Sequence, residues 1–286
     1  MGGVSSEREV SLNSGSNVAE ALKSLGKYEV VPVRLDAENL DAMPKDVEAV
    51  YIALHGGWGE NGGVQAELNK LKLPYTGPGV LASQIAMDKI KTKMVLEMNN
   101  VPTAPWMLAN QDTQCSPLAL PVVVKPPKEG SSVGISKVSK PEEWAAALKT
   151  AKVDPVLVEE FVPGREFTVA VVDGEAWPVI EIVAKGGWYG YEEKYTSEET
   201  RYPFFEDGEK AKKMQEIAIA AYKAVGCRGV TRVDFRMSPL GRMYVLELNT
   251  SPGFTSHSLV PKAGIKTGLS FAGVCERILQ SADYDR

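Results

Sequence analysis

The segments VTRVDF (residues 230–235) and YVLELN (residues 244–249) predict two strands of one hairpin, joined through a turn at SPLG (residues 238–241). Successive side chains on a strand point to opposite faces, so each segment has one apolar face and one face that carries polar side chains. The apolar face suits the core of a sheet. The hairpin therefore predicts a sheet that presents its polar side chains together on the opposite side.

Four polar residues mark that side: Arg232 and Asp234 on the first strand, and Glu247 and Asn249 on the second. If the two polar faces coincide, two carboxylates and one amide oxygen lie within cross-strand reach of one another. Oxygen ligands without Cys or His suit Mg²⁺, which takes one or two carboxylates together with substrate phosphates. An exposed hairpin with ordinary surface charges is the alternative. The following TSPG (residues 250–253) favours the metal site, because small residues let a ligand approach the backbone.

A second feature is VVVK (residues 122–125), which continues into PPKEGSSVG (residues 126–134). A strand here enters a Gly/Ser loop that returns as another strand, so backbone N–H groups and hydroxyls could hold phosphates while Lys125 supplies positive charge. The loop lacks the spacing G-x-x-x-x-G-K-[ST] of a Walker loop, and a strand rather than a helix follows it. A polar hairpin turn without a ligand is the alternative.

Two shorter motifs carry weaker signals. Lys89, in the sequence MDK at residues 87–89, is either a second phosphate cation or a solvated helical charge. GPGVLA (residues 77–82) matches the spacing G-x-G-x-x-A, but no convincing strand precedes it. We therefore interpret it as a turn and not as a dinucleotide-binding loop.

The N-terminal part alternates helix and strand patterns to about residue 77. Apolar residues at helical spacing predict a helix over residues 7–25, and Ser6 with Glu9 fits a capping box at its start. Apolar runs predict strands over residues 28–35 and 47–54. This order is typical of a small parallel α/β domain.

The remainder of the chain changes to an α+β pattern that is mostly antiparallel. Strand patterns are found at residues 121–125, 134–138, 156–161, 166–172 and 176–182, and helix patterns at residues 87–99, 142–149, 208–225 and 269–281. Residues 185–205 form a long polar stretch with little periodicity, as in a lid loop.

Composition excludes several classes of protein. The 286 residues are 44% hydrophobic and 24% charged with a net charge of −5, so there is no general basic surface for nucleic acid. Three widely spaced cysteines, Cys115, Cys227 and Cys275, support neither a disulfide framework nor a structural zinc site. No apolar run approaches the ~18 residues of a membrane span, and no secretory signal is visible. We expect a soluble cytoplasmic protein.

Together these segments resemble the ATP-grasp enzymes and, within them, the D-alanine–D-alanine ligases. The resemblance extends over essentially the whole chain in seven blocks: GGVSSEREVS at 2–11, LHG at 54–56, MDK at 87–89, VKP at 124–126 with GSSVG at 130–134, KY at 194–195, RVD at 232–234, and ELNTSPG at 247–253 with TSHSL at 255–259. The phosphate loop and the hairpin are general to ATP-grasp enzymes. The first block, KY and SHSL are specific to these ligases.

The resemblance implies an ATP-grasp fold and ATP with Mg²⁺ as cofactors. In such ligases the carboxylate of one D-alanine attacks the γ-phosphate of ATP, and the amine of a second D-alanine displaces phosphate from the D-alanyl phosphate. The resemblance assigns two Mg²⁺ ions, with Mn²⁺ as the alternative ion, to Asp234, Glu247 and Asn249. It assigns the phosphates to Lys89, Lys125 and Lys194, and the adenine and ribose to the stretch Glu159, Glu160, Phe161 and Val162 with Glu166.

The resemblance also implies the substrate contacts. It gives Glu7 the ammonium of the first D-alanine, although a carboxylate near a helix N-terminus is favourable even without a ligand. It places His55 near that substrate, and it makes Arg232 and the backbone N–H of Gly253 the oxyanion donors. Ser131 and Tyr195 join Glu7 in a network that ties the lid to the N-terminal domain. Ser258 and Leu259 receive the carboxylate of the second D-alanine.

Three domains are expected from the same resemblance: a substrate-side α/β domain over residues 1–77, a central ATP-grasp subdomain over 78–159, and a C-terminal ATP-grasp subdomain over 160–286 that carries the lid. A homodimer acting in peptidoglycan precursor synthesis is also implied. The sequence departs from the family pattern twice. Residue 61 is Asn where Asp is usual, and the short apolar strand that precedes Gly2 in the family is missing. Its absence predicts an uncovered core beside residues 28–35 and a less firmly placed Glu7.

Three other functions stay open. A sister ligase would join D-alanine to D-lactate or D-serine, whereas Lys194-Tyr195 favours the plain dipeptide. A different ATP-grasp ligase would act on another acid, which SHSL (residues 256–259) disfavours. A module that binds ATP without catalysis would fit the missing strand, but the residues assigned to Mg²⁺ and the oxyanion are all present.

Overall fold

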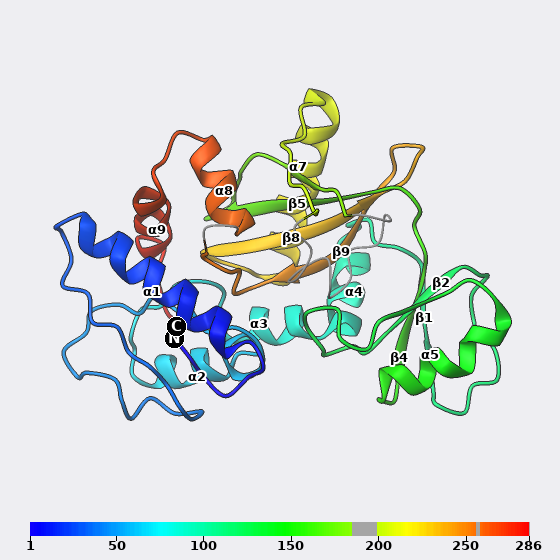
Figure 1. Ribbon diagram of the computed structural model, residues 1–286, viewed down its shortest axis with the longest axis horizontal. Coiled ribbons are helices and arrows are strands. Elements are labelled where there is room, and N and C mark those ends of the chain that lie inside the picture. Colours follow the sequence, from blue (N-terminus) through cyan, green and yellow to red (C-terminus); the bar gives the residue numbers. More distant parts are fainter. Residues whose placement is uncertain (185–198, 256–257, 286) are drawn as a thin grey trace.

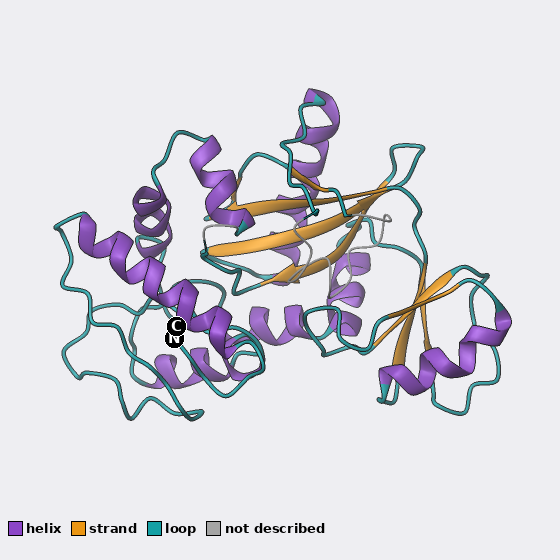
Figure 2. Cartoon of the chain, in the orientation of Figure 1, coloured by secondary structure: helices purple, strands orange, loops and turns teal. Residues whose placement is uncertain are grey.

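The computed structural model describes residues 1–184, 199–255 and 258–285. Two antiparallel sheets lie side by side, and the helices of the N-terminal part lie at the opposite end of the molecule from the smaller sheet (Figure 1). Figure 2 shows that the two sheets are separate, with helices packed on each of them. This mixed α/β architecture with antiparallel sheets confirms the predicted fold class.

The larger sheet has five strands in the order β6-β5-β8-β9, with β7 also paired to β5: β5 (Arg165–Val172), β6 (Glu175–Ala176), β7 (Ile180–Ile182), β8 (Val230–Met237) and β9 (Met243–Asn249). Both of its faces are buried. Alternate residues of β5 enter different cores, Phe167 and Val169 on one side and Ala170 and Val172 on the other. Two covered faces explain why β5 is a nearly continuous apolar run.

Helices from distant parts of the sequence cover the two faces. The Phe167 side packs against α3 (Val80–Met87), α4 (Lys89–Met98) and α7 (Gly208–Val225). The other side packs against α1 (Arg8–Ser24), α8 (Leu259–Lys266) and α9 (Phe271–Leu279). The N-terminal helix is therefore part of the core that carries the predicted metal hairpin.

The predicted hairpin is confirmed as β8 and β9. Asp234 lies opposite Glu247 and Arg232 lies opposite Asn249, so the polar faces do coincide. Immediately beyond this pair, Phe235 lies opposite Val245, and the register shift marks a bulge at Leu246. Bulges often lie beside functional sites because they re-aim neighbouring side chains.

The smaller sheet has the order β1-β4-β2-β3: β1 (Trp106–Ala109), β2 (Val122–Lys125), β3 (Ser136–Val138) and β4 (Val156–Glu160). It has a core of its own against α5 (Trp144–Ala151), which follows the short helix η2 (Pro141–Glu143). The strand patterns predicted β2, β3 and β4 but not β1. The boundaries of the three expected domains stay a prediction, while α3 and α4 share their core with the larger sheet.

The N-terminal part departs from the predicted pattern. It contains α1, η1 (Gly57–Gly59) and α2 (Gly63–Lys70), but the predicted strands over residues 28–35 and 47–54 do not form ladders. Leu35 of the first segment forms a parallel bridge with Gly2, and Val50 of the second forms one with Tyr75. Both segments instead line a groove of about 800 Å³. The two segments therefore have strand composition but are not paired with each other as strands.

The starts of three helices differ from the sequence prediction. Helix α1 begins at Arg8 with Glu7 as N-cap and no side-chain cap, so the Ser6–Glu9 capping box is not formed. The segment interpreted as a turn at residues 77–82 enters α3 at Val80. Asp88 has an extended backbone between α3 and α4, and its carboxylate caps α4 by accepting hydrogen bonds from the N–H groups of Ile90 and Lys91. The single helix predicted over residues 87–99 therefore begins at Lys89.

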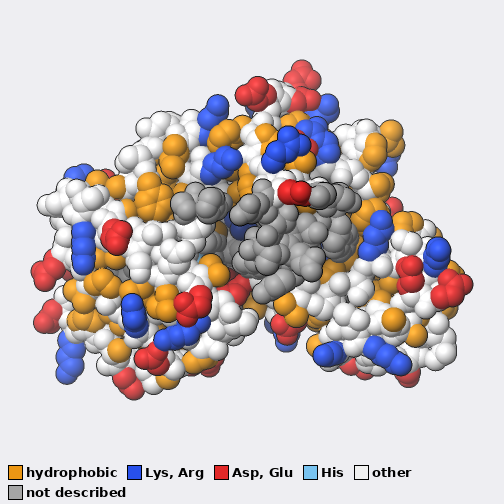
Figure 3. Space-filling view, in the orientation of Figure 1, with side chains coloured by type: hydrophobic (Ala, Val, Ile, Leu, Met, Phe, Trp, Pro, Cys, Tyr) orange, Lys and Arg blue, Asp and Glu red, His pale blue; other side chains and the backbone are white. Residues whose placement is uncertain are grey.

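The C-terminal tail docks near the N-terminal helices. Asp283 bridges to Tyr75, and the carboxylate of Asp285 accepts a hydrogen bond of 2.8 Å from the backbone N–H of Val80 at the start of α3. On the face drawn in Figure 3, acidic and basic side chains are interspersed. Within the described parts of the chain, no helix is both long and apolar enough to cross a membrane.

Candidate active site

A cavity of about 400 Å³ lies where α1, the loop after residue 54, α4, the loop after β2 and the end of the larger sheet meet. It brings together ten of the predicted site residues: Glu7, His55, Lys89, Ser131, Arg232, Glu247, Asn249, Gly253, Ser258 and Leu259. These residues are up to 252 positions apart (7 to 259) in the sequence. Lys194 and Tyr195 lie outside the described residues.

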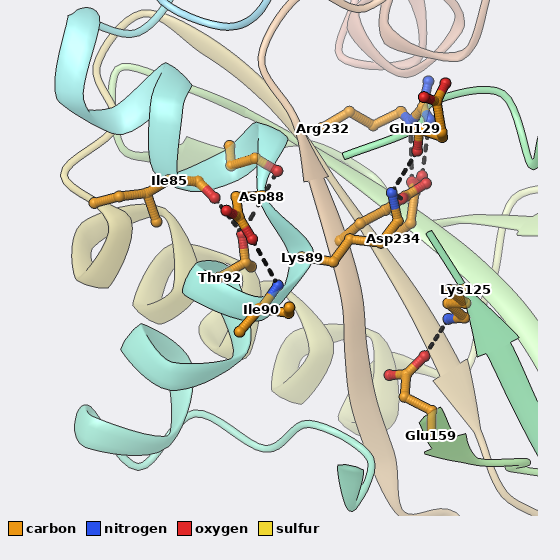
Figure 4. Close-up of polar contacts among 12 residues, drawn as sticks. Ile85, Asp88, Lys89, Ile90, Thr92, Lys125, Glu129, Glu159, Arg232 and Asp234 are labelled. Carbon is orange, nitrogen blue, oxygen red and sulfur yellow. Dashed lines mark hydrogen bonds and ion pairs between the residues drawn. The ribbon is translucent and has the colours of Figure 1, made fainter. Parts of the chain in front are cut away.

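Asp234 is held by its neighbours on the larger sheet. Arg232 forms a bidentate pair with it, at 2.9 Å from Nε to Oδ1 and 2.7 Å from Nη2 to Oδ2 (Figure 4). The Thr168 hydroxyl donates a 2.6 Å bond to Oδ1. The Asp234 residue is 5% exposed, so its charge is compensated within the protein. Residues at i and i+2 on one strand face, which the sequence assigned to different roles, thus contact one another directly.

The donor set of the hairpin fits a magnesium ion that is completed by phosphates. The carboxylates of Asp234 and Glu247 lie on facing positions, with the Asn249 amide nearby. In the described ranges, no group of three or more His, Cys, Asp or Glu side chains is arranged to hold a metal ion alone. Two carboxylates with an amide oxygen match an ion that takes its remaining ligands from a nucleotide and water.

Lys89, the first residue of α4, points toward the same place. Its Nζ donates a 2.7 Å hydrogen bond to the carbonyl of Glu129 in the Gly/Ser loop and lies 3.5 Å from Oε2 of Glu247 (Figure 4 shows the first of these). Its side chain is 10% exposed. Lys89 therefore connects the phosphate loop with the hairpin, which supports the prediction that it contacts phosphate.

Glu7 and Ser131 meet across the cavity. The Ser131 hydroxyl donates a short hydrogen bond to Oε1 of Glu7. Ser131 has a φ of +52°, in the left-handed region, so the loop places this residue in a less common conformation for a non-glycine residue. On the other side, a Cβ on Gly56 would lie 2.8 Å from Oε2 of Glu7, and Gly56 has a φ of +69°. Glycine at 56 thus permits the close approach of Glu7.

His55 is buried against the α1 helix and the loop after β9. Its Nε2 lies 3.0 Å from the hydroxyl of Ser14, and its Nδ1 lies 2.9 Å from the carbonyl of Ser251. Burial lowers the pKa of His55, although the Ser251 contact opposes that shift. The Ser14 hydroxyl also accepts a 3.0 Å bond from the N–H of Phe254, beside Gly253. Ser14 therefore links three separate segments of the site.

Glu60 is a carboxylate in the cavity that the sequence did not single out. Burial and the charge of Glu7 raise its pKa from 4.5 to about 7, against hydrogen bonding from Gly56. Its carbonyl accepts a 3.4 Å bond from the hydroxyl of Thr250. A carboxyl group that changes charge near neutral pH beside Glu7 is a feature of active sites.

The predicted nucleotide residues lie on the smaller sheet and its connection to β5. Glu159 is 2% exposed and forms ion pairs with Lys125 and Lys93 (Figure 4 shows the first). Glu166 pairs with Arg236 at 3.2 Å. Phe161 packs under the ammonium of Lys137, 3.8 Å from the ring centroid.

Four further predicted residues complete this picture. Val162 is buried, and its carbonyl accepts a 3.2 Å bond from Nε of Arg236, whereas Glu160 is exposed at the end of β4. Ser258 is the N-cap of α8, of which Leu259 is the first residue, and the Ser258 hydroxyl accepts a 2.8 Å bond from the N–H of Thr255. A helix start with these polar groups suits a carboxylate ligand.

Several residues of the site were missed: Ser14, Glu60, Lys93, Thr168 and Arg236. Ser14 and Lys93 carried a usable signal, since Ser14 lies on the apolar face of α1 and Lys93 is four residues from Lys89 on α4. A polar residue on a buried helical face needs a partner. Thr168 and Arg236 gave no signal, because only strand pairing brings them beside Asp234 and Glu166.

Comparison with known proteins identifies the family of the chain. Residues 91–280 match the family model described as D-ala D-ala ligase C-terminus. The chain is 42% identical over 290 aligned residues, 98% of its own length and 95% of the relative, to the D-alanine--D-alanine ligase of Actinobacillus pleuropneumoniae serotype 5b (strain L20). The chain belongs to the D-alanine–D-alanine ligase family.

Solved structures of this family and of a sister ligase have the same fold. The D-alanine--D-alanine ligase from Bacillus anthracis complexed with ATP superimposes with a TM-score of 0.86 at 31% identity, covering 98% of this chain and 94% of that one. The VanG D-Ala:D-Ser ligase from Enterococcus faecalis gives 0.84 at 28% identity, covering 98% and 97%. The family resemblance inferred from the seven sequence blocks is confirmed.

Proposed function

We propose that the protein joins two D-alanine molecules to D-alanyl-D-alanine, with conversion of ATP to ADP and phosphate through a D-alanyl phosphate. The observation that supports this most strongly is the convergence of Glu7, Ser131, Arg232, Glu247 and Ser258 on one cavity. A carboxylate for an ammonium group, cations and donors for developing negative charge, and a helix start for a second carboxylate are all present there.

The first step transfers the γ-phosphoryl group to a D-alanine carboxylate oxygen, and the bond from that phosphorus to ADP breaks. Lys89 and Lys125 neutralise phosphate oxygens, and the hairpin residues Asp234, Glu247 and Asn249 hold the divalent ion. The family implies ATP and a divalent ion in general, and we propose two Mg²⁺ ions. When bound, Mg²⁺ supplies neutralisation of the phosphate charge.

The second step forms the peptide bond. The amine of the second D-alanine attacks the carbonyl carbon of the acylphosphate and forms the C–N bond. The C–O bond to phosphate breaks as the tetrahedral centre collapses, and the leaving phosphate takes up the proton that the amine loses. Arg232 and the N–H of Gly253 stabilise the oxyanion. Removing one such oxyanion donor from an enzyme typically costs about 2.7–4 kcal/mol of transition-state stabilisation. The Asp234 pair fixes the plane of the Arg232 guanidinium, which keeps it pre-organised for this task.

Glu7 and Ser131 bind the first substrate in this proposal. The carboxylate of Glu7 takes the ammonium group, and the hydroxyl of Ser131 holds that carboxylate in place. His55 packs beside it, and Ser258 with Leu259 receives the second carboxylate. Lys194 and Tyr195 stay assigned to phosphate and to the Glu7 network.

A sister activity that uses D-serine or D-lactate is the second candidate, because a D-Ala:D-Ser ligase has the same fold at 28% identity. The experiment measures phosphate release from ATP and Mg²⁺ with D-alanine alone and with each second acceptor, using L-alanine as the control. Release with D-alanine alone, together with the dipeptide mass, supports the proposal. Release only when D-serine or D-lactate is added assigns the sister activity, and ATP binding without any release assigns a binding module.

We also propose a homodimer that works in the cytoplasm in peptidoglycan precursor synthesis. Light scattering during size-exclusion chromatography tests the dimer, and a monomer mass would overturn it. Rescue of a bacterial strain that lacks its own ligase tests the role in cell-wall synthesis, with Asp234→Asn as the inactive control.

A further inference from the structure

Lys93 is a buried lysine that the proposed reaction does not use. It lies on α4, is 1% exposed, and directs its ammonium group at Oε1 of Glu159 on β4. The same Nζ donates hydrogen bonds of 2.7 Å to the hydroxyl of Thr103 and 3.1 Å to the carbonyl of Ala104. The ammonium group of Lys93 therefore has two hydrogen-bond acceptors and one ion-pair partner.

Glu159 is shared between two cations. Lys93 contacts one carboxylate oxygen, and Lys125 at the end of β2 contacts the other. Burial opposes the charged form of Glu159, but the two lysines outweigh that effect and lower its pKa. Burial likewise lowers the pKa of Lys93, against the attraction of Glu159. We call Lys93, Glu159 and Lys125 the lysine cluster; it has two lysines for one carboxylate, and its net charge is +1 when both lysines are protonated.

The second lysine determines whether the ammonium group of Lys125 is available to bind an anion. With Lys93 present, Glu159 is already compensated, so the ammonium of Lys125 can turn toward an anion without leaving an unpaired buried carboxylate. Without Lys93, Lys125 would be the remaining cation beside a buried carboxylate. Breaking a buried pair in that way is costly.

Lys93 also connects the two sheets. The Thr103 hydroxyl that accepts from Lys93 donates a 2.9 Å bond to the carbonyl of Val245 on β9, and the N–H of Val245 bonds to the carbonyl of Pro102 at 2.8 Å. A continuous chain of polar contacts thus runs from β4 of the smaller sheet through Lys93 to β9, which carries Glu247. The side chain that compensates Glu159 also fixes its position relative to the metal hairpin.

We propose that Lys93 is a positioning residue of the nucleotide site, which compensates Glu159 so that Lys125 stays available to the phosphates of ATP. This inference rests on the proposed function, because it takes ATP as the nucleotide and Lys125 as one of its phosphate ligands. Lys93 itself is too deeply buried to touch the nucleotide.

The experiment measures ATP affinity, the KM values for ATP and D-alanine, and kcat for Lys93→Met. We expect KM and Kd for ATP to rise by about tenfold or more, the scale of changes in groups that support a ligand-binding residue, with a smaller change in the KM for D-alanine. Lys91→Met is the matched control, since Lys91 is exposed on the same helix. Its ATP affinity should equal that of the wild type.

Charge compensation of Glu159 by Lys93 makes a second prediction, which a purely structural role of Lys93 would not make. In Lys93→Met/Glu159→Gln the carboxylate that would retain Lys125 is gone, so ATP affinity should recover relative to Lys93→Met alone. Lys93→Arg should also recover affinity, because it restores the cation. If Lys93→Met does not fold, the comparison of the double variant with Glu159→Gln decides. Similar or tighter binding in the double variant supports the proposal, and a further tenfold loss contradicts it.

The failure of this inference differs from the failure of the proposed function. A wild-type enzyme that releases phosphate with D-alanine, together with a Lys93→Met variant that folds and binds ATP normally, overturns the role of Lys93 alone. A double variant that binds ATP no better than Lys93→Met also overturns it. A wild type that neither binds ATP nor releases phosphate overturns the proposed function itself.

Discussion

Two buried ion clusters differ in their charge balance, one on β8 of the larger sheet and one around Glu159 of the smaller sheet. On the larger sheet, Asp234 has one bidentate cation, Arg232, so that pair is neutral. In the lysine cluster, Glu159 is shared by Lys93 and Lys125, so one positive charge remains. A surplus cation is ready for an anion, whereas a metal ion must share Asp234 with a guanidinium. In the proposed function, the lysine cluster would offer its surplus cation to phosphate, and the hairpin would need a metal ion to complete its charge balance.

The largest effect on activity is expected when the Arg232–Asp234 pair of the hairpin is removed. Asp234→Asn removes a metal carboxylate and the partner of Arg232 at once. We expect kcat/KM to fall by roughly 10²–10³-fold or more, on the scale of losing a charged transition-state contact. Steady-state phosphate release measures this effect, with the exposed Glu175→Gln on β6 as the control. Activity within threefold of wild type would remove Asp234 from the metal site.

A smaller effect is expected at the junction of Glu7 and Ser131, which belongs to neither cluster. Glu7→Gln keeps the shape of the side chain but loses the charge that binds an ammonium group. We expect the KM for D-alanine to rise by about 10–100-fold while ATP affinity changes little, because charge-assisted hydrogen bonds contribute about 1.5–3 kcal/mol. Saturation kinetics at fixed ATP measure this split. A change confined to ATP affinity would contradict the assignment.

Much of the hairpin could be predicted because strand alternation is a local property of the sequence. Arg232, Asp234, Glu247 and Asn249 share one face for that reason alone, and the bulge at Leu246 does not disturb their pairing. The neutral pair of Arg232 with Asp234 was not predicted. Two side chains on one face can each turn toward a ligand or toward one another, and the sequence does not decide between these rotamers.

The contacts of the lysine cluster and the structure of the N-terminal part could not be predicted, because they depend on contacts between distant parts of the sequence. Lys93 on α4 meets Glu159 on β4 across 66 positions of sequence (93 to 159), a contact that no local pattern encodes. The apolar runs at residues 28–35 and 47–54 have strand composition but line a groove and have no ladder partner. Strand propensity cannot supply that partner. The capping box failed similarly, because Glu7 itself became the N-cap of α1.

A pH-dependent prediction concerns Glu60, which lines the same cavity as Glu7. Its pKa of about 7 in the folded protein is above the ordinary value of 4.5, so the folded state binds a proton more tightly than the unfolded state. The contribution of Glu60 to stability is therefore fully present below pH 4.5 and is lost as the pH rises through 7.

Glu60→Gln should remove this pH dependence. Relative to the wild type, the free energy of unfolding of the variant should increase as the pH rises from 4.5 to 7 and level off above that range. Urea unfolding at a series of pH values measures the difference. Parallel curves for the two proteins would show that Glu60 titrates at its ordinary pKa.

The smallest expected effect lies at the docked C-terminal tail. Asp285→Ala removes the carboxylate that caps α3 at the N–H of Val80, and caps of this kind are worth about 0.5–2 kcal/mol. We expect the thermal midpoint to fall by a few degrees with kcat and both KM values unchanged. Differential scanning fluorimetry and the phosphate assay measure these quantities. A fall in kcat with unchanged stability would place the tail in the catalytic machinery.

The central claim is that the Arg232–Asp234 pair and the lysine cluster serve one reaction. In that reaction each ATP consumed yields one peptide bond between two D-alanines. The most direct measurement is the amount of ADP, phosphate and dipeptide formed in the same reaction, with the dipeptide identified by mass. The account predicts the three in equal amounts with D-alanine and none with L-alanine. ADP and phosphate formed without dipeptide, or at the same rate without D-alanine, would contradict it.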